Sequence, residues 1–157
     1  MAIDLRRAAV LTRITLTGAA LCVLAGCATP APDLPAYESK AARTASSALS
    51  ELQTARLAAQ QSLAGRITQS YLEVLVSDAE DAYSSVTSTF DAVQPPDEPA
   101  ADKIRSALDT LLTDGGDAVG ELRIAVRRRD TATVAALDRQ LAGAATALST
   151  FDPAAVR

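Results

Sequence analysis

The stretch IRSALDTLLTDGGDAVGELRIA, residues 104–125, decides the fold of this chain. Its apolar and small residues recur at steps of four and three, which is the spacing of one face of an α-helix. The members of this stripe are Ile104, Leu108, Leu111, Gly115, Ala118, Leu122 and Ala125. Because the register continues through Gly115 and Gly116, we expect one long helix that is kinked or closely approached at the glycines. Two short helices joined by a loop are the alternative.

The same spacing recurs in three further stretches. Their members are Ala41, Ala45, Ala48, Leu52, Ala55, Ala59 and Leu63; then Leu72, Leu75, Ala79, Ala82, Val86, Phe90 and Val93; and last Val134, Leu137, Leu141, Ala144, Leu148 and Phe151. Val74 and Val76 broaden the second stripe, which indicates burial on more than one side at that end. Tyr37, Tyr71 and Tyr83 are expected at the edge of the core, with their hydroxyls reaching water.

Turn residues separate the four stripes at Gly65-Arg66, at the proline-rich segment 94–99 and at residues 127–131, where Asp130 is a candidate N-cap. We therefore predict helices over about 34–63, 67–93, 99–128 and 131–151. Short turns between amphipathic helices favour an all-α, antiparallel up-down-up-down four-helix bundle, here over residues 34–152 and preceded by an N-terminal signal segment.

That N-terminal segment, residues 1–26, combines early arginines with an apolar run too short to span a membrane. It ends in Leu24, Ala25 and Gly26 and is followed by Cys27, an order that resembles the lipobox of a bacterial lipoprotein signal peptide. The resemblance implies cleavage before Cys27, lipid on its sulfur, and anchorage to the extracytoplasmic face of the cell membrane. Residues 27–33 would then be the lipidated N-terminus and a short tether. An uncleaved anchor, or an ordinary signal peptide with a chance cysteine, is the alternative.

The remainder of the chain resembles helical-bundle lipoproteins of actinobacteria whose role is not characterised. The resemblance rests on the segments SDAED at 77–81, STFD at 88–91 and QPPD at 94–97. It implies a fold and an anchor but no activity.

The composition excludes several classes of function. Histidine and tryptophan are absent, and aromatic residues make up 3% of the chain. Without histidine there is no Ser-His or Cys-His pair and no histidine-based metal site, so we expect neither an enzyme nor a metal or cofactor. Removal of residues 1–26 would leave 12 basic against 18 acidic residues, which argues against nucleic-acid binding. The acidic residues Asp78, Glu80 and Asp81 are predicted to form a solvated face, and Glu73 and Glu80 lack the cleft that a carboxylate hydrolase needs.

The predicted topology gathers opposite charges at the two ends of the bundle. A tether of about six residues reaches at most about 20 Å, so one end lies near the bilayer. That end would hold Asp33, Asp91, Asp97, Glu98, Asp102 and Asp152. The far end would hold Arg66, Arg127, Arg128 and Arg129, our candidate contact for an envelope protein or an anionic envelope polymer. The alternative reading of the arginines is that they only complement a helix dipole.

The sequence therefore predicts a membrane-anchored, non-enzymatic interaction, scaffold or sensor module of the cell envelope. A carrier bundle for a small ligand or a lipid is the second candidate, although alanine-rich helix seams favour tight packing over a cavity.

Overall fold

The computed structural model describes residues 31–156, which form four long helices and a short 3-10 helix. They are α2 (Leu34–Leu63), α3 (Gln69–Asp91), α4 (Pro99–Arg128), α5 (Thr131–Ser149) and the 3-10 helix η2 (Pro153–Ala155). No strand forms within these residues. The prediction of an all-α four-helix bundle is confirmed. The predicted signal segment and lipobox, with Leu24, Ala25, Gly26 and Cys27, lie outside the described residues.

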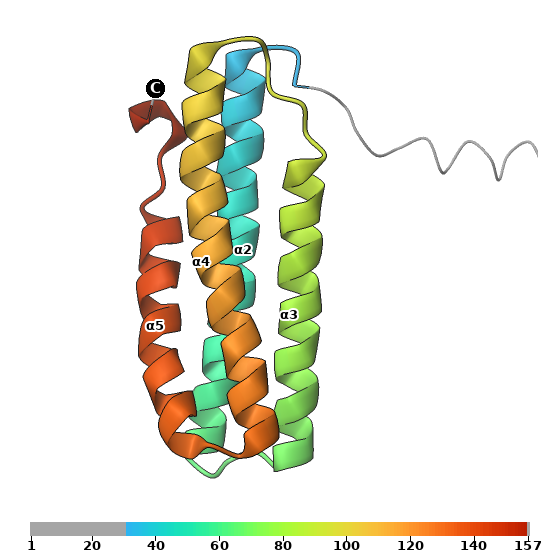
Figure 1. Ribbon diagram of the computed structural model, residues 1–157, viewed down its shortest axis with the longest axis vertical. Coiled ribbons are helices and arrows are strands. Elements are labelled where there is room, and N and C mark those ends of the chain that lie inside the picture. Colours follow the sequence, from blue (N-terminus) through green and yellow to red (C-terminus); the bar gives the residue numbers. More distant parts are fainter. Residues whose placement is uncertain (1–30, 157) are drawn as a thin grey trace, which may run out of the picture.

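The four helices lie side by side, as Figure 1 shows, with α4 in front of α2 and with α3 and α5 on either side. The α2–α3 and α4–α5 connections share one end of the bundle, and the α3–α4 connection lies at the other end, so helices that follow each other in the sequence run in opposite directions. At this second end the backbone N–H of Ala31 donates to the carbonyl oxygen of Gln94 at 3.4 Å. The chain therefore enters α2 beside the α3–α4 connection.

Side-chain caps set where three of the helices begin. Asp33, Thr68 and Asp130 each accept a hydrogen bond from the backbone N–H three residues later. Such caps satisfy amide groups that have no partner within the helix. The cap at Thr68 explains why α3 begins at Gln69 rather than near residue 67. The helix α5 ends at Ser149, before the predicted residue 151, and Asp152 then caps η2.

The core follows the predicted stripes, with shifts of one residue in three helices. Leu112 is buried instead of Leu111, and Ala145 instead of Ala144. In α3 the buried positions are Val76 and Tyr83, whereas Leu75 and Ala82 are half-buried. The stripes return to predicted residues further along each helix, so the shifts do not accumulate. Each newly buried residue follows a step of four where the prediction placed a step of three. Either order of the two steps keeps close to 3.6 residues per turn, so the spacing in the sequence does not select between them.

Tyr83 packs directly against the glycines of α4, which is one continuous helix through Gly115 and Gly116, as predicted. Its hydroxyl donates to the carbonyl oxygen of Leu112 at 2.9 Å. Burial, followed by the nearby carboxylate of Asp114, raises the pKa of this phenol. The hydroxyl is thus held neutral and hydrogen-bonded in the core, so the expectation that it reaches water is wrong.

Tyr37 is also fully buried, contrary to expectation, and its ring centroid lies 5.8 Å from that of Phe90. Arg105 lies over the ring of Phe90, with its guanidinium carbon 5.8 Å from the ring centroid. The same guanidinium donates to the carbonyl oxygens of Asp91 and Val93 at 3.0 Å each. Asp91 is the last residue of α3 and Val93 lies in the connection that follows, so Arg105 caps the end of α3 and holds the α3–α4 connection in place.

Candidate functional site

Four arginines gather at the end of the bundle that carries the α2–α3 and α4–α5 connections. Arg66 follows α2, Arg127 and Arg128 occupy the last turn of α4, and Arg129 follows them. All four side chains are exposed. We call these four residues the basic tip; it is the lower end in Figure 1. Two connections about 60 residues apart in the sequence thus present their cations on one surface.

The backbone of Arg129 is unusual for its residue type. Its φ of 56° is left-handed, and it is the only non-glycine residue with positive φ in the described part of the chain. The N–H of Arg129 bonds the carbonyl of Val126, and the N–H of Asp130 bonds that of Ala125. The same two bonds form after α2, where the N–H of Gly65 bonds the carbonyl of Ser62 and the N–H of Arg66 bonds that of Gln61. The left-handed residue there is Gly65, with a φ of 68°. The chain therefore places glycine at one of two equivalent helix ends and arginine at the other.

Substitution of Arg129 by glycine is expected to stabilise the fold. A left-handed backbone costs a side-chain-bearing residue about 1–2 kcal/mol, and the greater freedom of glycine in the unfolded chain offsets part of the gain. We expect Arg129→Gly to raise the free energy of unfolding by about 0.5–1 kcal/mol in urea titrations. Gly65→Ala, the reverse change at the matched position, is expected to lower it by a similar amount. Loss of stability in Arg129→Gly would show that the arginine side chain supports the fold.

The cations of the basic tip have few partners of their own. Arg66 donates to Gln61 at 3.5 Å, and within residues 31–156 no hydrogen bond or ion pair engages the side chains of Arg127, Arg128 or Arg129. The nearest carboxylate in sequence, Asp130, accepts from the backbone N–H and the hydroxyl of Thr133. These two bonds, with a smaller effect of Arg128, lower the pKa of Asp130. The carboxylate caps α5 and leaves the three arginines free to bind another molecule.

Polar links between helices hold this end of the bundle together. Asp138 of α5 forms an ion pair with Arg56 of α2 at 3.3 Å and accepts from Gln60 at 3.0 Å. Gln69 of α3 donates to the carbonyl oxygen of Val126 in α4 at 2.7 Å. A surface whose scaffold is fixed in advance loses less entropy when it binds a partner.

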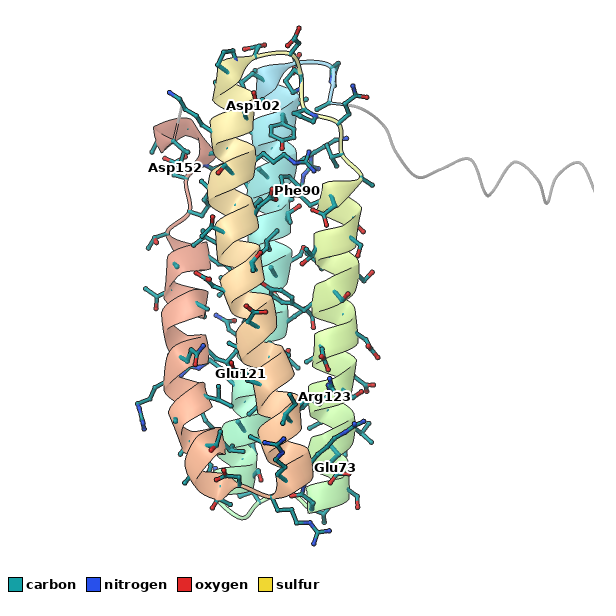
Figure 2. All side chains as sticks on the ribbon, in the orientation of Figure 1. Glu73, Phe90, Asp102, Glu121, Arg123 and Asp152 are labelled. Carbon is teal, nitrogen blue, oxygen red and sulfur yellow. The ribbon has the colours of Figure 1, made fainter. Side chains whose placement is uncertain are left out.

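A second ion pair, between Glu80 of α3 and Arg123 of α4, occupies part of the predicted acidic face. Glu73 accepts a hydrogen bond from the side chain of Gln69 at 2.9 Å, so Glu73 and Glu80 each have a polar partner. Figure 2 places Glu73 and Arg123 along neighbouring helices near the basic tip. No group of three or more potential metal ligands forms among the described residues. Within this same range, no helix combines the length and apolarity needed to cross a membrane.

Sequence reasoning missed the apolar residues that surround the basic tip. Five large hydrophobic side chains are 43% to 57% exposed within the described range. They form what we call the apolar collar: Leu57, Leu63, Tyr71, Val74 and Ile124. Leu63 and Val74 were expected to be buried, but Leu63 is the last residue of α2 and Val74 lies on α3 at the edge of a groove toward α4. Leu57 and Ile124 lie off the predicted buried stripes, so the spacing in the sequence already indicates that these two side chains are exposed.

Comparisons of the chain with protein-family models, with curated proteins and with solved structures found no match. Inferences about function therefore rest on the geometry of the basic tip and its surroundings.

Proposed function

We propose that this chain is a lipid-anchored, extracytoplasmic interaction module of a bacterial cell envelope. It performs no catalysis, and its basic tip binds an acidic partner. The observation that carries the proposal is the exposed arginine cluster, above all Arg129 in a backbone conformation that suits glycine. Backbone strain at an exposed, charged residue is characteristic of sites that bind another molecule. Complementing the dipole of α4 requires cations in its last turn, where Arg127 and Arg128 already lie.

The described chain begins, at Ala31, at the end of the bundle opposite the basic tip, so an anchor at Cys27 would be joined to that end. Ala31 is buried beside Gln94, so only residues 28–30 separate Cys27 from the folded chain. The four Cα–Cα steps from residue 27 to residue 31 reach at most about 14 Å, which is shorter than the tether expected from the sequence. Asp102 and Asp152 lie at this same end, as Figure 2 shows, and anionic head groups would repel them. A 30-residue helix such as α4 then carries the arginines about 45 Å farther from the bilayer.

Photo-crosslinking in living cells from a probe at position 128 tests the proposal. Mass spectrometry of the trapped material is expected to identify one discrete acidic envelope protein. The matched control is a probe at Lys103, an exposed cation near the start of α4 at the other end of the bundle. A result in which the two probes trap the same material, or in which position 128 traps nothing, would contradict the proposal.

The alternative of a carrier for a small ligand or lipid receives no support from the grooves on the bundle. The groove between α3 and α4 near the tip is lined by Ser70, Glu73, Ser77, Arg123 and Arg127, with Val74 and Val126. Another, along α4, is lined by polar and charged side chains, among them Asp102, Arg105 and Asp109. Apolar ligands need cavities lined mainly by hydrophobic side chains. We therefore propose the interaction module alone.

A further inference from the structure

The apolar collar surrounds the basic tip on several sides and lies close to it. Leu57 is six residues before the end of α2, Val74 five residues after the start of α3, and Ile124 four residues before the end of α4. At 1.5 Å per residue, all three lie within about 9 Å of their helix ends. Leu63 and Tyr71 lie nearer still to the α2–α3 connection. All the exposed large hydrophobic side chains of the described range therefore lie in the half of the bundle that carries the arginines.

Members of the collar face in different directions. The helices α2 and α4 lie across the bundle from each other, with α3 between them on one side. Leu57 and Ile124 occupy the outward positions of α2 and α4, so they lie on opposite faces of the molecule. Val74 lies on α3 at the edge of the groove toward α4. No flat surface can cover all three side chains at once.

This arrangement distinguishes between two kinds of partner. If the basic tip approached a bilayer end-on, the arginines would meet the head groups first. The collar would then lie behind them, at head-group level or in water. A bilayer approached from the side would cover one face of the collar only. A concave protein surface can contact the arginines at its base and the collar along its walls. Arginine and tyrosine are enriched in protein interfaces, where a few well-buried anchors carry most of the binding energy.

We infer that the basic tip seats end-on in a concave protein surface, with carboxylates at the base of the cleft and apolar side chains along its walls. The inference rests on the proposed function and specifies the partner of the same site. The charge of the base follows from the unpaired arginines Arg127, Arg128 and Arg129, and the shape of the cleft follows from the collar.

The test uses the full chain in cells, with photo-crosslinking probes placed one at a time at Leu57, Val74 and Ile124. The controls are Ser46, Ser85 and Thr113, all exposed and each eleven residues away toward the acidic end. Eleven residues are three helical turns, so each control shares the helix face of its probe about 16 Å farther from the tip. We expect the protein trapped at position 128 to be trapped from all three collar positions and from none of the controls. The crosslinked peptides are expected to line one acidic cleft.

Leu57→Ala and Ile124→Ala are each expected to reduce the position-128 adduct about fivefold, since a half-exposed side chain would become buried on binding. Both residues are exposed, so these variants leave the core intact.

Three outcomes would overturn the inference: protein adducts from one collar position only, lipid adducts from the collar, or adducts that extend equally to the three controls. If position 128 still traps a protein, the proposed function holds in each of these three cases. Absence of that adduct at position 128 would overturn both.

Discussion

Gly115→Ala is expected to destabilise the protein by about 2 kcal/mol and to lower its thermal midpoint by about 8 °C. A Cβ atom at position 115 would overlap the hydroxyl oxygen of Tyr83 and lie 3.3 Å from Cδ1 of Leu52. Tyr83 is 3% exposed, so its ring cannot retreat into solvent. Moving it would break the hydrogen bond to Leu112 and leave a buried hydroxyl without a partner, at a cost of about 1–3 kcal/mol. The better helix propensity of alanine, about 1 kcal/mol, offsets only part of this cost.

Gly116→Ala is the matched control for this measurement. A Cβ atom at position 116 would lie 3.5 Å from Cε1 of Tyr83, which is ordinary van der Waals contact. We expect this variant to be as stable as the parent chain or up to about 1 kcal/mol more stable. Tyr83→Phe removes the overlapping oxygen, so the cost of Gly115→Ala is expected to fall by at least about 0.5 kcal/mol in that background. Equal stability of the two alanine variants would show that Tyr83 does not fill the space beside Gly115.

The sequence predicted the number, order and approximate bounds of the helices because each element is long and strongly amphipathic. It did not predict that Tyr83 enters the core. Periodicity gives only the approximate direction of each side chain around the helix, and the neighbouring residue Ala82 fits the predicted stripe as well. The space for the ring comes from Gly115, on a helix that follows after the α3–α4 connection. Only the pairing of two helices in three dimensions relates a small residue on one to a large residue on the other.

The four arginines were identified from the sequence because turn positions and alternating helix directions together place Arg66 near Arg128. The left-handed backbone of Arg129 was not identified, since nothing in a run of three arginines marks one of them as strained. The apolar collar was missed for a related reason. A residue such as Val74 extends an apolar stripe in the sequence, and only the packed bundle reveals that its side chain stays exposed.

Reversing the charge of the basic tip is expected to abolish partner binding while the fold persists. The variant combines Arg66→Glu, Arg127→Glu and Arg129→Glu, with the photo-crosslinking probe at position 128. Two opposite charges in contact in water attract by about 1 kcal/mol, so loss of three such contacts weakens binding about 100-fold before repulsion is counted. The expected readouts are loss of the adduct in cells and, with the partner purified, a weaker affinity than that of the parent chain. All three side chains are exposed, so the free energy of unfolding should fall by less than about 1 kcal/mol, mostly through the dipole of α4.

The control reverses three exposed cations outside the basic tip and so produces the same change in net charge. Arg43 and Lys103 lie toward the opposite end of the bundle, and Arg139 lies about 12 Å along α5 from the tip. Long-range attraction depends on net charge and is screened within about 8–10 Å at physiological salt, whereas direct contacts depend on position. If binding uses the tip, the control keeps most of its affinity and shows only a slower association. If both variants lose affinity equally, the arginines act as part of a general field and the contact lies elsewhere. Retention of the adduct in the tip variant would exclude the arginines from the interface, and Arg129 would then be strained without a role in binding.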